Sequence, residues 1–331
     1  MKVALALQGG GSHGAFTWGV LDRLLEDERF EIEAISGASA GTVNAIALAN
    51  GMLQGGRDGA REALQKFWNA VAALTPPGFF QEAFTESALR AVPSPSLQAF
   101  LALARYFTPY QLNPFDLNPL RDILQAQIDF ERLRRSRLKL FVATTRVRTG
   151  TLRVFRTPEI DLTVVLASAC LPLLHHTVMI GDEPYWDGGL TANPPLYPLL
   201  KECAARDVVA VLLHPRTWPV NPTSAGDISH RLTEISFGAA FFSELQGIAL
   251  ARKTALQSWF AWGALARHLR RFDLHVIDSP DLMGSLDALS RLNSQASFIM
   301  ALRDAGRERA DAWLRDYGAV RPAIDLDQLL E

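Results

Sequence analysis

The sequence has few cysteines, no excess of charge of one sign and no long apolar run. Its 331 residues include only Cys170 and Cys203, so a disulfide-rich secreted scaffold is excluded and two reduced, buried thiols are expected. A formal net charge of -2 gives no general attraction to nucleic acid, and we expect no nucleic-acid partner. No stretch holds the roughly 18 charge-free apolar residues that a bilayer span needs, so any membrane contact is expected to be peripheral.

Targeting and metal-binding patterns are also missing. The first residues, MKVALALQGGG, lead from one lysine into glycines without a long apolar region or a cleavage site. We therefore expect no signal peptide and a cytoplasmic location. The sequence has no HExxH, no Asp-rich calcium loop and no CxxC pair, so neither a metal nor another cofactor is expected. Nothing in the sequence indicates an oligomeric state.

Apolar segments with the patterns of strands and of helices alternate along most of the sequence. Hydrophobic residues form 48% of the chain, which is enough for a substantial core. Short apolar runs predict strands at 2–8, 31–36, 138–147, 151–156, 178–180, 184–186, 207–213 and 272–278. Helical periodicity follows residue 14 and recurs at 39–49, in a broken form over 52–135, and at 229–270 and 290–316. We expect Asn50-Gly51 to end the second of these helices. This order favours an α/β sheet between helices.

The first motif with chemical meaning is Gly37-Ala38-Ser39-Ala40-Gly41, a G-x-S-x-G. A predicted strand ends directly before it and a predicted helix begins at Ser39, which is the setting of a nucleophile elbow. Such a turn projects the serine hydroxyl at the head of a helix, whose N-terminus stabilises negative charge. The alternative is an ordinary turn with a helix-capping serine.

The second motif is Gly9-Gly10-Gly11-Ser12-His13-Gly14, between the first strand and the first helix. It fits the G-x-G-x-x-G of a dinucleotide-binding fold, but that fold needs an acidic residue at the end of the second strand. Glu31 and Glu33 stand at the beginning of that strand instead. The free N–H groups of such a loop can also form an oxyanion hole. Neighbouring parallel strands would bring this loop and the serine turn to the same sheet edge.

The third motif is Asp187-Gly188-Gly189, which on its own is typical of a plain turn. A Ser-His-Asp hydrolase needs a histidine downstream of its acid. If no downstream histidine is suitable, an aspartate such as Asp187 becomes a candidate for the base. The downstream histidines are His214, His230, His268 and His275. Only His214 ends a predicted strand, so it remains the alternative base.

These three motifs, in this order, resemble the patatin-like phospholipase family. Two further stretches are similar to that family, Ala167-Ser168-Ala169-Cys170-Leu171-Pro172 and Asn193-Pro194-Pro195. The resemblance covers residues 1 to about 215 well and the rest more loosely. It implies a three-layer α/β/α sandwich with a mostly parallel central sheet. Residues 1–331 would form one domain, with a helical cap-like insertion at about 52–135 and a helix and strand extension at about 216–331.

The resemblance also implies a Ser-Asp dyad without a histidine, with Ser39 as nucleophile and Asp187 as base. His13 stands where many family members have arginine or lysine, and it would support the loop as a protonated or neutral donor. The implied oxyanion-hole residues are Gly9, Gly10, Gly11, Ser12 and Gly14. The implied supports of the other two motifs are Gly37, Gly41, Gly188 and Gly189.

The implied activity is lipid acyl hydrolysis, of the phospholipase A, lysophospholipase or carboxylesterase type. The substrates would be carboxylic esters of fatty acyl chains. The aromatic segment at 76–107 is interpreted as helix packing, with a mobile acyl-chain cap that touches a membrane as the alternative. Two other functions stay open: a nucleotide-binding oxidoreductase, and a non-catalytic lipid-binding or regulatory protein on the same fold.

Overall fold

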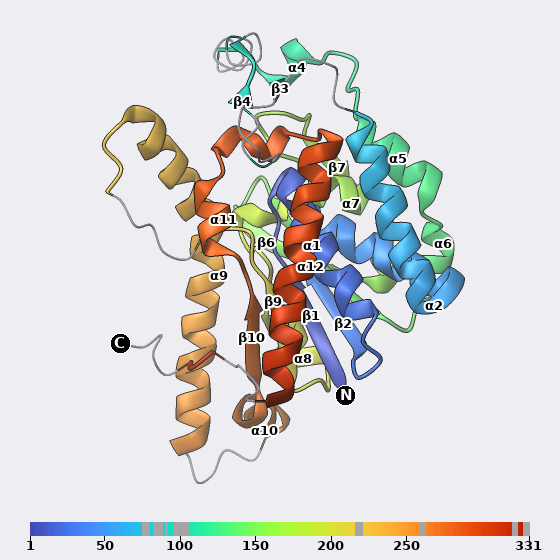
Figure 1. The fold of residues 1–331 in the computed structure, drawn as a ribbon, viewed down its shortest axis with the longest axis vertical. Helices are drawn as coiled ribbons and strands as arrows, with labels where there is room; N and C mark the ends of the chain where they lie inside the picture. The colour runs from blue at the N-terminus through green and yellow to red at the C-terminus, as the bar shows by residue number, and fades with distance from the viewer. Residues whose placement is uncertain are drawn as a thin grey trace.

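The computed structural model describes residues 1–74, 80–81, 89, 92–95, 99, 106–215, 221–257, 263–319 and 324–326. Within these residues, an eight-stranded sheet runs in the order β10-β9-β1-β2-β5-β8-β7, with β6 paired to β5 (Figure 1). The strands are β1 (Lys2–Leu7), β2 (Glu31–Gly37), β5 (Lys139–Arg146), β6 (Thr151–Arg156), β7 (Val178–Ile180), β8 (Glu183–Asp187), β9 (Asp207–Val211) and β10 (Asp273–Ile277). A separate two-stranded pair joins β3 (Phe80–Gln81) to β4 (Val92–Pro93).

The five neighbouring strands from β10 to β5 are parallel, whereas β6 and β8 pair antiparallel with β5, and β7 pairs antiparallel with β8. This confirms the predicted mostly parallel sheet. Strands β1 and β2 are direct neighbours, and Leu7 at the end of β1 pairs with Gly37 at the end of β2. The glycine loop after β1 and the serine turn after β2 therefore leave the sheet at the same edge.

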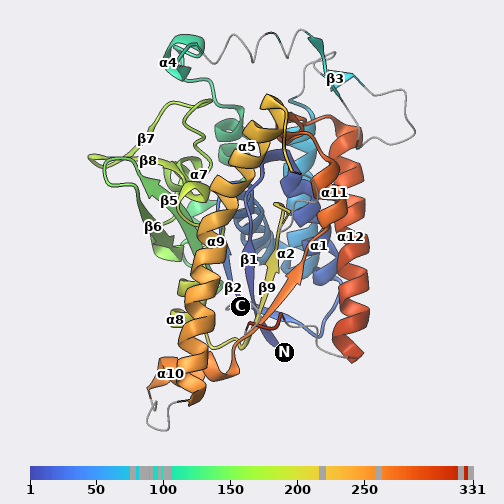
Figure 2. The same cartoon turned by 90° about the vertical axis from the view of Figure 1, so that its left-hand side faces the viewer.

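Helices cover both faces of the sheet, as Figure 2 shows with α9 on one side and α12 on the other. Alternate side chains of β1 explain the two cores. Val3, Leu5 and Leu7 face one core, and Ala4 and Ala6 face the other. The first core is shared with α1 (Gly14–Leu25), α2 (Ala40–Ala72) and α12 (Ala296–Ala319). The second is shared with α8 (Tyr197–Glu202), α9 (Ala225–Gln257) and α10 (Ala264–Arg271).

Shorter helices connect these layers. The α-helices are α4 (Pro109–Leu112), α5 (Pro119–Gln127), α6 (Phe130–Leu133), α7 (Leu162–Ser168) and α11 (Pro280–Ser285). The 3-10 helices are η1 (Gly11–His13), η3 (Thr157–Glu159), η4 (Gly188–Leu190) and η5 (Ala288–Leu292). The predicted strands agree with the structure to within one or two residues at each end, and β7 and β8 form the hairpin predicted around Gly181-Asp182.

The prediction that Asn50-Gly51 ends a helix is wrong. Helix α2 continues through both residues, and its backbone leaves helical geometry only at Gly55 and Gly56. The side chain of Asn50 forms hydrogen bonds with the connection between α5 and α6. The amide donates to the Gln127 carbonyl and accepts from the Asp129 N–H, both at 3.1 Å. A tertiary contact therefore uses the polar group that sequence reasoning interpreted as a stop signal.

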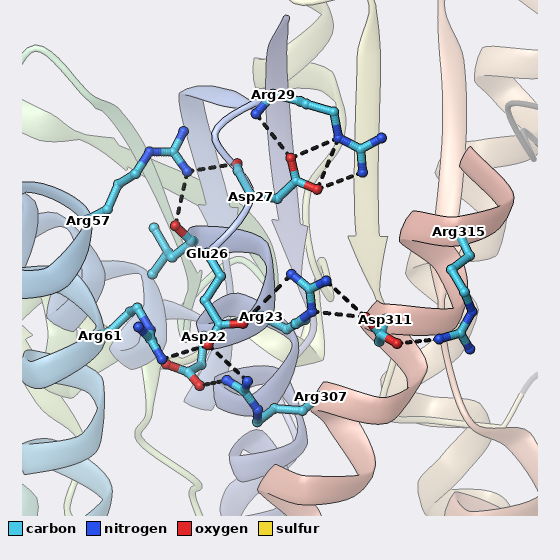
Figure 3. A network of polar contacts seen from close by, with 11 residues as sticks. Asp22, Arg23, Glu26, Asp27, Arg29, Arg57, Arg61, Arg307, Asp311 and Arg315 are labelled. Carbon is cyan, nitrogen blue, oxygen red and sulfur yellow. Dashed lines mark hydrogen bonds and ion pairs between the residues drawn. The ribbon is translucent and has the colours of Figure 1, made fainter. Parts of the chain in front are cut away.

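Helix α12 joins the C-terminal part of the chain to α1. Ion pairs link the two helices and α2 (Figure 3): Asp22 on α1 binds both Arg61 on α2 and Arg307 on α12. Arg23 on α1 also binds Asp311 at 2.9 Å. Partly exposed pairs of this kind contribute little each. Helix α12 also contributes buried apolar side chains to the core that it shares with α1, namely Phe298, Ile299 and Leu302.

Two expectations about membranes can be compared with the described residues. None of the helices described is long and apolar enough to cross a bilayer. Most of the aromatic segment at 76–107 lies outside the described residues, including Phe79, Phe84, Phe100, Leu101 and Leu103. Its last two residues are described, and the exposed fractions of Tyr106 and Phe107 are 84% and 44%.

Candidate active site

Ser39 occupies a sharp turn between β2 and α2. Its φ of 52° and ψ of -124° are unusual for a residue with a side chain, and such a conformation costs about 1–3 kcal/mol. The turn is held from the end of α7, because the Ser39 N–H donates to both the carbonyl and the hydroxyl oxygen of Ser168, at 3.1 and 3.2 Å. The Thr42 hydroxyl lies 2.8 Å from the same Ser168 hydroxyl. The Ala167–Pro172 stretch therefore positions the serine turn.

The glycine loop lies directly against this turn. A Cβ atom on Gly9 would stand 2.7 Å from the Cβ atom of Ser39, closer than real Cβ atoms approach. On the other side, a Cβ atom on Gly41 would stand 2.1 Å from the Leu7 carbonyl oxygen. Only glycine fits at these two positions, and together they bring the ends of β1 and β2 into contact beside the serine.

Asp187 ends strand β8, which runs antiparallel to β5 and so approaches the serine turn from the other direction. Strand β8 lies along β5 just beyond the end of β2: Gly37 pairs with Val142, and Asp187 pairs with Thr144 two residues further on. The Asp187 side chain is fully buried, and its Oδ1 accepts a hydrogen bond from the Gly189 N–H at 2.7 Å. Its Oδ2 makes no hydrogen bond of ordinary geometry with the described residues.

Burial raises the pKa of Asp187 to about 7, against the opposing effect of the nearby Ser39 hydroxyl and of the hydrogen bond from the Gly189 N–H. Removal of the carboxyl from water disfavours its charged form. A carboxyl that is half ionised near neutral pH, beside a serine hydroxyl, has the basicity that proton transfer from that hydroxyl needs.

The N–H groups of the glycine loop fall into two sets. The Gly9 N–H donates to Asn193 Oδ1 at 2.7 Å, and the Gly14 N–H is bound by carbonyls of the preceding 3-10 turn. The N–H groups of Gly10, Gly11 and Ser12 have no partner among the hydrogen bonds of the described residues. They lie at the start of η1, where helical N–H groups lack intrahelical acceptors. These three are the donors left for an anion.

Asn193 supports the glycine loop, and the sequence did not predict this contact. In the sequence, its stretch Asn193-Pro194-Pro195 indicates only the resemblance to the family and no role in the site. In the structure Asn193 is fully buried, and besides holding Gly9 it accepts from the Gln8 side chain through its carbonyl at 3.1 Å. The Gln8 side chain in turn accepts from the N–H groups of Leu213 and His214. The only signal in the sequence was the short distance from Asp187.

His13 does not supply the positive charge of the basic residue found at its position in many family members. It is buried, and its Nε2 lies 2.7 Å from the Ser290 hydroxyl, which donates to the Asp287 carbonyl. Nε2 therefore carries the proton in this contact. Burial, followed by the positive charge of Arg291, holds the pKa of His13 well below its ordinary value. His13 is a neutral donor to η5 at neutral pH.

The alternative triad base, His214, lies beside the glycine loop but is not joined to Ser39. Its Nε2 is 3.1 Å from the Gly9 carbonyl oxygen and its Nδ1 is 2.7 Å from Glu234. His230 binds the other oxygen of Glu234 at 3.2 Å. Both nitrogens of the His214 ring are thus committed to other partners.

Neither acidic residue of the dinucleotide-binding alternative reaches the glycine loop. Glu31 and Glu33 lie at the start of β2, whereas the loop lies at the end of β1. Glu33 binds Lys139 and the N–H groups of Ala204 and Ala205. No group of three or more metal-ligating side chains in the described part of the chain is placed to hold a metal ion.

A mostly parallel sheet that carries a strained serine turn beside a glycine loop defines a class of α/β serine hydrolases. The model of the Patatin-like phospholipase family matches residues 5–200, more than half of the chain. The chain therefore belongs to the patatin-like phospholipase family. This membership indicates lipid acyl hydrolase activity.

Comparison with solved structures gives VipD from Legionella pneumophila, at 16% sequence identity and a TM-score of 0.42. The match covers 93% of this chain and 66% of that chain, so this chain spans just under two thirds of the length of VipD. No protein of curated function matches the chain.

Proposed function

We propose that the protein cleaves carboxylic esters of fatty acyl chains, with Ser39 as nucleophile and Asp187 as general base. One observation carries the proposal: the fully buried carboxyl of Asp187, whose pKa is raised to about 7, interacts with the hydroxyl of a serine in a strained turn. A serine hydroxyl is a weak nucleophile until a neighbouring base takes its proton. No metal or other cofactor takes part in the proposed reaction.

In the first half of the reaction, Asp187 takes the Ser39 proton while Oγ attacks the ester carbonyl carbon. The electron pair of the carbonyl bond moves onto its oxygen and forms a tetrahedral anion. The N–H groups of Gly10, Gly11 and Ser12 are the donors proposed to stabilise this anion, and losing one such donor typically lowers the rate by ~10²–10³-fold. Collapse of the intermediate breaks the bond to the alcohol, which leaves with the proton from Asp187.

In the second half, water takes the place of the alcohol. Asp187 removes a proton from the water while the water oxygen attacks the acyl carbon bound to Ser39. A second tetrahedral anion forms at the same donors. Its collapse breaks the bond to Ser39 Oγ, which recovers a proton from Asp187, and the fatty acid leaves. The dyad thus returns to its starting state.

Exposed apolar side chains at 106–117 and 173–174, which we call the apolar cluster, support a lipid substrate and peripheral contact with a lipid surface. Tyr110 joins two segments of this cluster, because its ring stacks on His176 with centroids 4.2 Å apart and its hydroxyl accepts from the Thr177 N–H at 3.2 Å. The second segment directly follows the stretch that holds Ser39. The exposed apolar side chains are Tyr106, Phe107, Tyr110, Leu112, Phe115, Leu117, Leu173 and Leu174.

The proposal treats residues 1–331 as one domain. Strand β10 completes the sheet on the far side of β9, and α12 packs on α1, which begins at the glycine loop. The C-terminal part therefore shares the sheet and the core of the part that carries the motifs.

The test is hydrolysis of p-nitrophenyl acetate, butyrate and octanoate by the native protein, Ser39→Ala and Asp187→Asn. We expect both variants to lose at least ~10³-fold in kcat while they stay folded. Ser285→Ala and Asp182→Asn are matched controls at exposed positions and should keep native activity.

Two other outcomes would contradict the proposal. Activity that survives in Asp187→Asn but is lost in Ser39→Ala would assign the base to another residue. A native protein that binds liposomes but turns over none of the three esters would support a non-catalytic lipid-binding role.

A further inference from the structure

A cluster of charged side chains contacts the glycine loop at the Gly9 carbonyl. It is formed by His214 after β9, Glu234 on α9 and Arg291 on η5. The side chains of His214 and Glu234 are only 3% and 2% exposed. All three residues lie beyond residue 200, where the match to the family model ends. Buried charges of this kind are costly unless they are paired, so their position calls for a reason.

The hydrogen bond between His214 and the loop has a defined direction. A carbonyl oxygen can only accept, so His214 Nε2 carries a proton and donates it to the Gly9 carbonyl at 3.1 Å. The Gly9 carbonyl and the Gly10 N–H belong to the same planar trans peptide unit and point in opposite directions. A donor that fixes the Gly9 carbonyl therefore also sets the direction of the Gly10 N–H.

The preceding peptide unit is fixed in the same way, because Asn193 Oδ1 holds the Gly9 N–H at 2.7 Å. The two consecutive peptide units at Gly9 are thus bound from Asn193 and from His214. The Gly10 N–H is the first N–H of the loop without a partner among the described residues. His214 is therefore placed to orient the Gly10 N–H.

Glu234 orients His214. Its Oε2 lies 2.7 Å from His214 Nδ1, and its Oε1 is bound by His230 and Arg291. Burial opposes ionisation of Glu234, but hydrogen bonds from His214 and His230 and the charge of Arg291 hold its pKa far below the usual range. Burial lowers the pKa of His214, and the bond to Glu234 acts against this. The contact with Gly9 requires only the proton on Nε2, which the neutral Nε2–H tautomer carries as well as the imidazolium.

The cluster also packs tightly around the loop. The ring of Phe237 lies parallel to the His214 ring, with 6.0 Å between centroids, and it contacts Gly189 of the Asp187 turn. The Arg291 carbonyl oxygen lies 2.5 Å from the place where a Cβ atom on Gly11 would stand. The His214 side chain therefore has little room to change its position relative to Gly9.

We propose that His214, oriented by Glu234, is a positioning residue that directs the Gly10 N–H toward the anion formed during ester hydrolysis. The inference rests on the proposed function of Ser39 and Asp187 and adds a role for the C-terminal third of the chain. His214 does not touch the reacting atoms. It acts through the Gly9–Gly10 peptide unit, so it should affect the stability of the transition state and leave substrate binding unchanged.

A second buried histidine–carboxylate pair provides a matched control. His275 on β10 is fully buried, and its Nε2 lies 2.9 Å from Asp207 Oδ1. Asp207 begins β9, at the sheet edge opposite the one where the glycine loop lies. Replacing His275 disturbs a similar buried pair without touching the loop.

The experiment compares His214→Leu, His214→Gln and His275→Leu with the native protein. It measures kcat and KM for p-nitrophenyl butyrate, the rate of inactivation by diethyl p-nitrophenyl phosphate, and the melting temperature. Attack on that phosphate ester also develops negative charge on an oxygen in the anion site. We expect His214→Leu to lower kcat and the inactivation rate by about 10- to 100-fold, with KM within about threefold of native. His214→Gln, whose amide can donate to Gly9, should recover most of the loss, and His275→Leu should lower only the melting temperature.

Two results would overturn the inference alone: native kcat in His214→Leu, or a glutamine variant no better than the leucine variant. If His214→Leu does not fold, His214→Asn replaces it, because the shorter amide can reach Glu234 but not Gly9 and should be less active than His214→Gln. A native protein that turns over no ester would overturn the proposed function together with this inference, whereas an active native protein with unaffected His214 variants leaves the proposed function intact.

Discussion

Asn193 Oδ1 accepts a hydrogen bond from the Gly9 N–H at 2.7 Å, across 184 positions of the chain. Asn193 follows the Asp187-Gly188-Gly189 turn closely, so one connection carries both the proposed base and a support of the glycine loop. The bond occupies the first N–H of the loop and leaves the next three free. It thereby divides the loop into a part that is anchored and a part that is available to an anion.

Replacing Asn193 should damage catalysis more than stability. Asn193→Ala leaves the buried Gly9 N–H without an acceptor, which costs about 1–3 kcal/mol of unfolding free energy. The loosened loop should lower kcat for p-nitrophenyl butyrate by about 10- to 100-fold, because the oxyanion donors lose their fixed positions. Urea unfolding and steady-state kinetics on the same preparation measure both effects.

Asn50→Ala is the control for this substitution. Asn50 is also buried and also bonds backbone groups of distant segments, but these belong to α5 and α6 and not to the glycine loop. We expect a similar loss of stability with kcat unchanged. Equal losses of kcat in the two variants would mean that Asn193 acts only through general stability.

The pH dependence of the reaction should follow the ionisation of Asp187. As the proposed base, Asp187 can accept a proton from Ser39 only when it is ionised, and burial raises its pKa to about 7. We therefore expect kcat/KM to rise about tenfold per pH unit below pH 7 and to level off above it. Initial rates between pH 5 and 9, corrected for the ionisation of p-nitrophenol, give the profile. A midpoint near 4, or a flat profile, would contradict a buried Asp187 base.

The same burial should make Asp187 a source of instability at alkaline pH. The folded-state pKa of about 7 lies above the ordinary value of 3.8, so between these two values the folded protein holds a proton that the unfolded chain has lost. The stability due to this group is full below pH 3.8 and is lost progressively as the pH rises from there to about 7. A shift of this size corresponds to roughly 4 kcal/mol at pH 8.

Asp187→Asn removes this penalty, because the amide does not ionise and can still accept from the Gly189 N–H. The stability of the variant relative to the native protein should therefore be about 2–3 kcal/mol more favourable at pH 8 than at pH 5, because part of the cost is already present at pH 5. Urea unfolding of both proteins at the two pH values measures this difference. No change in the difference between pH 5 and pH 8 would show that the buried carboxyl carries no such cost.

The parts of the site that could be predicted from the sequence are those with local signals. The strand, the glycine-flanked Ser39 and the following helix occupy one short stretch, and the first strand with its glycine loop occupies another. Parallel pairing of these two strands then brings both turns to one sheet edge, as the pairing of Leu7 with Gly37 confirms. Asp187 required the resemblance to a family, because a D-G-G alone is typical of a plain turn.

The contacts around these motifs could not be predicted, because they join residues that are far apart in the chain. The bond from Ser39 to Ser168 and the bond from His214 to Gly9 depend on how the layers pack. The same reason explains the error at Asn50, where a tertiary partner satisfies a side chain that on its own favours a helix end. Local patterns identify chemical groups, and tertiary packing determines which of those groups are already occupied.

The attachment of α12 should depend on two glycines. A Cβ atom on Gly19 of α1 would stand 1.9 Å from the Arg303 carbonyl oxygen, and one on Gly306 of α12 would stand 2.1 Å from the Phe16 carbonyl oxygen. Gly19→Ala should therefore force the two helices apart and destabilise the protein by about 2–3 kcal/mol.

Gly247→Ala on α9 is the control, because nothing lies within 4 Å of its Cβ position. It should stabilise the protein by about 0.5–1 kcal/mol, since alanine favours a helix interior over glycine. Thermal unfolding of both variants decides the point: if Gly19→Ala melts at or above the native temperature, α1 and α12 do not lie as close as these distances require.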